Sequence, residues 1–169
     1  MAPSTTTQKR LTWEQICNDP SLQDLPYKIE TNARGQIVMS PTHQYHGKLA
    51  FMIASELAEL LPDGEASVES AIRTARGVKV ADAIWCTKER WEQIKDTYDA
   101  PVAPQICVEV LSPTNTEEEI AEKRDLYFEA GAEEVWLCDR EGNLSFFDAD
   151  GPRESSGRVP SFPKSIERE

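Results

Sequence analysis

The chain has 169 residues, of which 39% are hydrophobic and 28% charged, with a formal net charge of −12 at pH 7. This length fits one domain with a substantial core, and the acidic balance argues against broad neutralisation of nucleic-acid phosphates. Divalent cations bridging clustered acids to a phosphate would still permit a phosphodiesterase. No apolar run approaches the roughly 20 residues of a membrane span, and residues 1–10 lack a signal-peptide core, so we expect a soluble, cytoplasmic protein.

The cysteines favour a reduced interior. They are far apart, form no CxxC pair, and three of them fall in predicted strands beside apolar residues. We therefore interpret them as core residues rather than zinc ligands or disulfide partners. The four are Cys17, Cys86, Cys107 and Cys138.

Composition divides the chain into three parts. Residues 1–10 are rich in Ser and Thr, which predicts a flexible N-terminus. Residues 11–150 carry the periodic patterns of a single folded domain. Residues 151–169 are rich in Pro, Gly, Ser and charge, which predicts a loose C-terminal tail.

The N-terminal part predicts a small helix followed by a hairpin. Thr12 and Gln15 have the spacing of a capping box, and a hydrophobic pair flanks the cap, so a helix should start there. Short strand-like runs at residues 27–30 and 36–39 flank an Asn-Ala-Arg-Gly turn. Because Asn and Gly tolerate positive φ, we expect a β-hairpin.

The central part predicts a helix followed by three strands. Residues 43–61 have apolar side chains at helical spacing and stop at Pro-Asp-Gly. Strands are expected at 66–74 and 78–86, with a helical patch near 88–95. Residues 105–111 are nearly all apolar, which is typical of a strand covered on both faces, and we expect this strand to be central.

The C-terminal part predicts a long helix and two strands. Residues 114–117, Thr-Asn-Thr-Glu, fit a capping box that opens a helix running to about Ala130, with Gly131 at its end. Strands are expected at 135–138 and 144–147. The predicted order of the core is therefore helix, three strands, helix, strand.

Two acids interrupt apolar strands. Alternation places Asp82 in the middle of a row of apolar side chains, and Glu109 interrupts the central strand. If these strands are neighbours, the carboxylates can meet and bind a hard cation such as Mg²⁺ through oxygen. Each acid alone also fits a satisfied core acid or a strand-end acid that faces solvent; the pair favours a site.

A lysine lies on the wrong face of the second long helix. At 100° per residue, Lys123 falls near Ile120 and Tyr127 on the stripe that faces the sheet. Two interpretations remain open. Lys123 is either a site residue, or a lysine whose stem packs on the sheet while its amine reaches water.

Accessory candidates lie on both helices. His46 falls on the apolar stripe of the first long helix, where it fits either a structural histidine or a site residue. Glu56 lies at the edge of the same stripe and could join a metal site or face solvent. We add Tyr127 as a third accessory candidate.

Four motifs together resemble the Uma-two family of restriction endonucleases, within the PD-(D/E)XK nuclease superfamily. The resemblance covers residues 11–148. The motifs are Gly35-Gln36-Ile37-Val38-Met39-Ser40-Pro41 followed by His46; Val80-Ala81-Asp82; Val108-Glu109-Val110-Leu111-Ser112-Pro113; and Lys123-x-x-x-Tyr127-x-x-x-Gly131 leading into Glu134-Val135-Trp136-Leu137. Together they are specific, although each alone is weak.

The resemblance implies both a fold and a site. The fold class is α/β with an α+β mixed sheet, a restriction endonuclease-like α-β-β-β-α-β core with an added N-terminal helix and hairpin. Asp82 would be the acid of the PD element and Glu109 the second metal-binding acid. The backbone carbonyl of Val110 would be a further ligand, and Lys123 the catalytic lysine.

The chain departs from the superfamily pattern at two positions. Ala81 stands where a proline usually precedes the aspartate, which concerns only backbone preference. Leu111 stands where the lysine of the E-x-K element is usually found. Catalysis therefore requires Lys123 to reach the site from the helix.

Our leading hypothesis is Mg²⁺-dependent hydrolysis of DNA phosphodiester bonds, with Mn²⁺ as a substitute metal and no covalent intermediate. One alternative is a catalytically silent module of the same fold that serves binding or assembly. Another is an enzyme acting on RNA or a small phosphodiester. By analogy with nucleases that cut two strands, a homodimer is plausible, and residues 144–147, expected as an edge strand, are one candidate contact.

Overall fold

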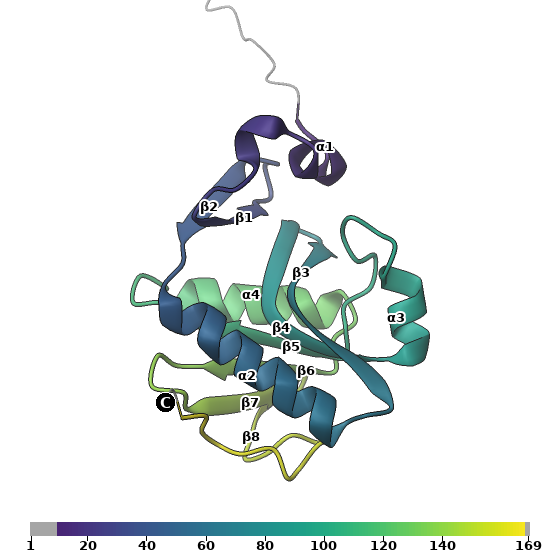
Figure 1. The fold of residues 1–169 in the computed structure, drawn as a ribbon, viewed down its shortest axis with the longest axis vertical. Helices are drawn as coiled ribbons and strands as arrows, with labels where there is room; N and C mark the ends of the chain where they lie inside the picture. Colours follow the sequence, from purple (N-terminus) through teal and green to yellow (C-terminus); the bar gives the residue numbers. More distant parts are fainter. Residues whose placement is uncertain (1–9, 168–169) are drawn as a thin grey trace, which may run out of the picture.

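A computed structural model describes residues 10–167 of the chain (Figure 1). The flexible N-terminus was expected at residues 1–10, of which all but residue 10 lie outside the described residues. The helical segments are α1 (Trp13–Cys17), a 3₁₀ turn (Pro20–Leu22), α2 (Gln44–Leu60), α3 (Lys88–Ile94) and α4 (Glu117–Glu129). The strands are β1 (Tyr27–Thr31), β2 (Ile37–Pro41), β3 (Gly64–Thr74), β4 (Gly77–Thr87), β5 (Ile106–Val110), β6 (Glu134–Cys138), β7 (Leu144–Asp148) and β8 (Gly151–Arg153).

Within the described range the strands form a six-stranded sheet of order β3-β4-β5-β6-β7-β8 and a separate two-stranded sheet, β1-β2. Only β5 and β6 pair in parallel among the named pairs of the large sheet, with α4 as their crossover. The expected mixed α/β sheet is confirmed, and β5, buried along its whole length, lies inside it as predicted.

Helices cover both faces of the large sheet. Figure 1 shows α2 crossing in front of the sheet and α4 lying behind it. Leu49, Ile53 and Leu57 of α2 pack into one core cluster with Trp85 and Trp136. Tyr127 of α4 packs into a second cluster on the opposite face. Both faces of the sheet are therefore covered, as expected for a sheet that contains a strand buried at every position.

Capping boxes fix the starts of two helices. The Thr12 hydroxyl accepts a hydrogen bond from the Gln15 amide, as predicted. The second box uses Thr116 and Glu119, two residues later than expected. The reason is local: residues 112–115 form a turn closed by the Asn115 amide on the Ser112 carbonyl, so the helix cannot begin at Thr114.

The β1–β2 hairpin is fastened to one end of β4. The Thr31 hydroxyl accepts a hydrogen bond from the Val78 amide at 2.8 Å, and the Lys79 amine donates to the Thr31 carbonyl at 2.7 Å. Gly77 makes this contact possible, because a Cβ at this position would lie 2.4 Å from the Thr31 carbonyl oxygen. The hairpin therefore has a fixed position above the large sheet (Figure 1).

The segment after Asp148 differs from the expected loose tail. Its first residues form β8, which pairs with β7. Val159, Phe162 and Ile166 are buried against Trp136 in the core. The compositional prediction was wrong because Pro and Gly here shape a packed strap, whose few apolar residues supply burial energy.

The same segment changes the status of β7. Because β8 pairs with Phe146, Phe147 and Asp148, β7 is not the edge of the sheet, and the edge-strand contact expected there is not available in that form. The cysteines are all free, and three of them are buried, as predicted. No helix within residues 10–167 has the length and apolar character needed to span a membrane.

Candidate functional site

Asp82 and Glu109 meet where two antiparallel strands part. The pairing of β4 with β5 runs from Trp85–Ile106 to Ala83–Val108, and the next position on each strand carries an acid. Asp82 Oδ2 accepts a hydrogen bond from the Val110 amide at 2.7 Å. The carboxylate thus takes the place of a main-chain partner at the point of separation, so both acids lie at the same opening in the sheet.

The regular alternation of β4 is interrupted at Asp82. Ala81 packs in the same cluster as Ile84, whereas Ala83 packs in the cluster on the other face. The single unbroken row of side chains expected along this strand is therefore wrong. Glu69 of β3 lies between the residues that pair with Ala83 and Ala81, and it has φ of 51°, a conformation that is costly for a residue with a side chain. Strain is thus concentrated beside the acid.

Lys28 of the hairpin lies between the two acids. Its amine is 3.0 Å from Asp82 Oδ1 and 3.3 Å from Glu109 Oε2. The Lys28 side chain is only 16% exposed. Burial would lower the pKa of this lysine, but the negative charges of Glu109, Asp82 and Glu30 raise it well above 10.5. Lys28 is therefore held as a cation.

Lys123 reaches the acids from α4. Its amine is 3.1 Å from Glu109 Oε1 and 2.8 Å from Glu30 Oε2. Glu30 is fixed in turn by the Val80 amide, which donates to its Oε2 at 2.6 Å. The helix therefore supplies the cation that the strand lacks at Leu111, and the amine is oriented by two carboxylates.

Glu109 is the most enclosed of the acids. It is 5% exposed, and the Tyr127 hydroxyl donates to its Oε1 at 2.6 Å. Burial raises the pKa of Glu109, but Lys123, Lys28 and this hydroxyl outweigh burial and bring it from 4.5 to about 2. Glu109 is therefore charged at neutral pH.

Asp82 lies in the opposite electrostatic situation. Burial raises its pKa above 3.8, and the neighbouring charge of Glu109 raises it further. Lys28, Lys123 and the Val110 amide act in the opposite direction without cancelling these two effects. The two carboxylates therefore titrate as an interacting pair, in which the charge of Glu109 disfavours the charge of Asp82.

His46 contacts the carbonyl expected as a further ligand. Its Nε2 lies 2.5 Å from the Val110 oxygen, so the ring donates through this nitrogen. The buried Nδ1 has no hydrogen-bond partner among the described residues. The Val110 oxygen keeps a second lone pair, so this hydrogen bond does not exclude a ligand role.

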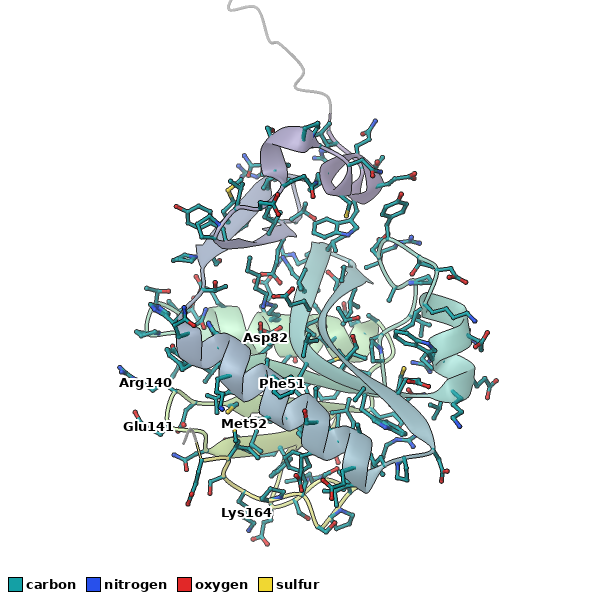
Figure 2. All side chains as sticks on the ribbon, viewed as in Figure 1. Phe51, Met52, Asp82, Arg140, Glu141 and Lys164 are labelled. Atoms are coloured by element: carbon teal, nitrogen blue, oxygen red, sulfur yellow. The ribbon has the colours of Figure 1, made fainter. Side chains whose placement is uncertain are left out.

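A cleft of about 800 Å³ opens beside Asp82. Lys28, His46 and Glu69 line it, and its rim includes the exposed rings of Tyr27 and Tyr98. Figure 2 shows Asp82 near the middle of the molecule, on β4 of the large sheet. Asp82 is therefore the acid that the cleft reaches, whereas Glu109 lies behind it and does not line the cleft.

The structure brings Asp82, Glu109, Lys123, His46 and Tyr127 together, whereas Glu56 lies about 15 Å further along α2 than His46. Glu56 was a poor candidate because helical periodicity gives the face on which a residue lies, but not its distance along the helix from the two acids.

Sequence reasoning missed Lys28 and Glu30. The only signal was weak: the two residues share one face of a five-residue strand, and charges are common on such a half-exposed strand. A pair of buried acids also needs more than one cation to compensate it.

The donor set fits a divalent metal. The two carboxylates and the Val110 carbonyl are hard oxygen ligands, which Mg²⁺ and Mn²⁺ accept, with water and substrate oxygens completing the shell. Within residues 10–167 there is no group of three or more His, Cys, Asp or Glu side chains arranged for a metal. The ammonium of Lys28 nevertheless shows that a cation fits between Asp82 and Glu109.

Comparisons with known proteins identify the fold and the family of the chain. No match was found among curated proteins. A crystal structure of a putative nuclease belonging to DUF820 from Anabaena variabilis ATCC 29413 shares the fold, with a TM-score of 0.71, 14% identity, and coverage of 94% of this chain and 95% of that one. The family model described as "Uma2: Putative restriction endonuclease" matches residues 14–154, which contain every residue of the site. The chain therefore belongs to the Uma2 family of putative restriction endonucleases.

Proposed function

We propose that this protein is a metal-dependent endonuclease that hydrolyses phosphodiester bonds of DNA, with Mg²⁺ as its cofactor and Mn²⁺ as a substitute. The observation that carries the proposal is the meeting of Asp82 and Glu109 around one cation, beside an open cleft. Family membership supports a nuclease, and the metal and the DNA substrate are our inferences.

The metal would be held by Asp82, Glu109 and the Val110 carbonyl. A divalent ion bound there supplies Lewis-acid polarisation of the phosphate and makes a nearby water more acidic. Hydrolysis joins the water oxygen to phosphorus, breaks one phosphorus–oxygen ester bond, and transfers a proton to the leaving oxygen.

Lys123 is the residue that we place closest to the attacking water. Glu109 and Glu30 hold its amine at 3.1 and 2.8 Å, so its direction is fixed before substrate arrives. A fixed ammonium can orient a water or offset negative charge as it develops on the phosphate. The Tyr127 hydroxyl donates to Glu109 and fixes the orientation of its carboxylate, so Tyr127 is a positioning residue.

The test is cleavage of supercoiled plasmid and of single-stranded DNA with Mg²⁺ or Mn²⁺. Wild type should convert plasmid to nicked or linear forms, and Asp82→Ala and Lys123→Ala should lose this activity while remaining folded. Cleavage retained by Asp82→Ala would refute the assignment. No cleavage by folded wild type would favour a silent module or another phosphodiester, such as RNA.

A further inference from the structure

We propose that Lys28 is an internal cation that occupies the metal position of the metal-free protein and is exchanged for the divalent ion when that ion binds. The inference rests on the proposed function, because it takes the metal to bind between Asp82 and Glu109. It adds Lys28, which the family motifs do not include. In this proposal Lys28 neutralises the two acids until the divalent ion binds.

The first support is the choice of oxygens. Asp82 Oδ2 is used by the Val110 amide, and Glu109 Oε1 is used by Lys123 and Tyr127. Lys28 contacts the remaining oxygen of each acid, Oδ1 and Oε2. These two oxygens are the ones that the fold leaves for a shared metal. An ion at about 2.1 Å from them would collide with the amine, so the two cations exclude each other.

The second support is the charge of the cluster. Three carboxylates face two ammonium groups, so one negative charge is already in excess. Without Lys28, Asp82 and Glu109 would face each other across the opening with only Lys123 to compensate them, which is costly in a buried place. A divalent ion could replace Lys28 without this cost.

The third support is that the exchange needs only a side-chain movement. β1 is held through Glu30 and Thr31, whose contacts with β4 do not involve Lys28. The lysine side chain has a flexible four-carbon stem. Both Lys28 and Asp82 line the cleft. The released ammonium can therefore turn into the cleft, where it would meet the negative charge of a bound phosphate.

The test is the affinity for Mn²⁺, measured by calorimetry or by electron paramagnetic resonance, without any substrate. Lys28→Met should bind Mn²⁺ at least about tenfold more tightly than wild type, since both the competing amine and one positive charge are gone. The matched control is Lys79→Met. Lys79 is a half-buried lysine that bonds the Thr31 carbonyl, and its loss also removes one charge, yet it occupies neither free oxygen.

We expect Lys79→Met to change the affinity by less than about threefold, the effect of a nearby charge alone. Equal gains in the two variants would overturn the exchange, because they would show a general charge effect. An unchanged or weaker affinity in Lys28→Met would overturn it too, since Lys28 would then be holding the acids in place for the metal.

A second measurement uses wild type, in case Lys28→Met does not fold. The side-chain NH₃⁺ signal of Lys28, assigned through bonds by NMR, should be protected from solvent exchange in the metal-free protein and lose its protection on addition of Mg²⁺. A signal that keeps its protection at saturating Mg²⁺ would overturn the exchange.

The two proposals can fail separately. Tighter Mn²⁺ binding by Lys28→Met together with no cleavage of any nucleic acid would support the exchange and refute the nuclease. Cleavage by wild type without tighter binding by Lys28→Met would support the nuclease and overturn the exchange.

Discussion

Two buried glutamates on adjacent parallel strands have opposite surroundings. Glu134, at the start of β6, is 7% exposed and accepts hydrogen bonds from the Trp136 indole, the Ser156 hydroxyl and the Arg158 amide. Glu109, near the end of β5, is 5% exposed and contacts two lysine amines and a tyrosine hydroxyl. The two acids are alike in burial and differ in their partners.

The difference separates a structural acid from a site acid. Two of the three donors to Glu134 come from the C-terminal strap, so this acid fastens the strap to the sheet. Two of the partners of Glu109 are lysine ammonium groups, and one of them, Lys28, lines a cleft. Burial alone therefore does not indicate a site; charged partners beside open space do.

The largest expected effect in this comparison is that of Lys123→Met on cleavage. Removing the amine held by Glu109 and Glu30 should lower kcat by about 10² to 10⁴-fold, the range for a lost proton-transfer or charge-stabilising group. Arg158→Met is the matched control, because Arg158 contacts Glu133 and, through its amide, Glu134. We expect cleavage by the folded control to be unchanged. A similar loss of cleavage in both variants would contradict the distinction between the surroundings of Glu109 and those of Glu134.

A middle-sized effect comes from deleting one hydroxyl at each acid. Tyr127→Phe and Ser156→Ala each remove one donor to a buried carboxylate, and each should lower the free energy of unfolding by about 1.5–3 kcal/mol. Only Tyr127→Phe should also reduce Mn²⁺ affinity, because it frees Glu109 to rotate. Urea denaturation and metal titration of both variants measure this; an equal fall in Mn²⁺ affinity in Ser156→Ala would contradict the account.

The smallest effect is on acid stability. The folded-state pKa of Glu109 is about 2, below its ordinary 4.5. Its charge therefore contributes stability that is present above pH 4.5 and lost as the pH falls toward 2. Asp82, whose folded pKa is raised above 3.8, contributes with the opposite sign and offsets part of this loss. In Glu109→Gln the free energy of unfolding should fall less steeply over this window, as measured by urea denaturation at several pH values; an unchanged slope would contradict the pKa of Glu109.

Local patterns predicted most of the fold. Apolar periodicity identified α2, β4 and β5 to within one or two residues, because the apolar side chains of these elements form the core. The strap was missed because its apolar residues, Val159 and Phe162, are separated by Pro and Ser and have no regular period. Their burial depends on the distant Trp136, which local composition does not encode.

The candidate site was predicted only where a charge breaks an apolar pattern. Asp82, Glu109 and Lys123 do so, and their strands and helix carry them to one place. Lys28 and Glu30 belong to a short, half-exposed strand, where charges are ordinary. Their role follows from the docking of the hairpin on β4, a long-range contact that depends on Gly77 and Thr31.

The most direct test of the central claim compares Glu109→Gln with Glu134→Gln in the same plasmid-cleavage assay, with rates corrected for the folded fraction. Each change keeps the size of the side chain and removes one buried negative charge. The account predicts that folded Glu109→Gln loses cleavage, whereas Glu134→Gln unfolds more easily but cleaves at the wild-type rate while folded. Wild-type cleavage by Glu109→Gln would contradict the account, because the acids around Lys28 would then be as structural as Glu134.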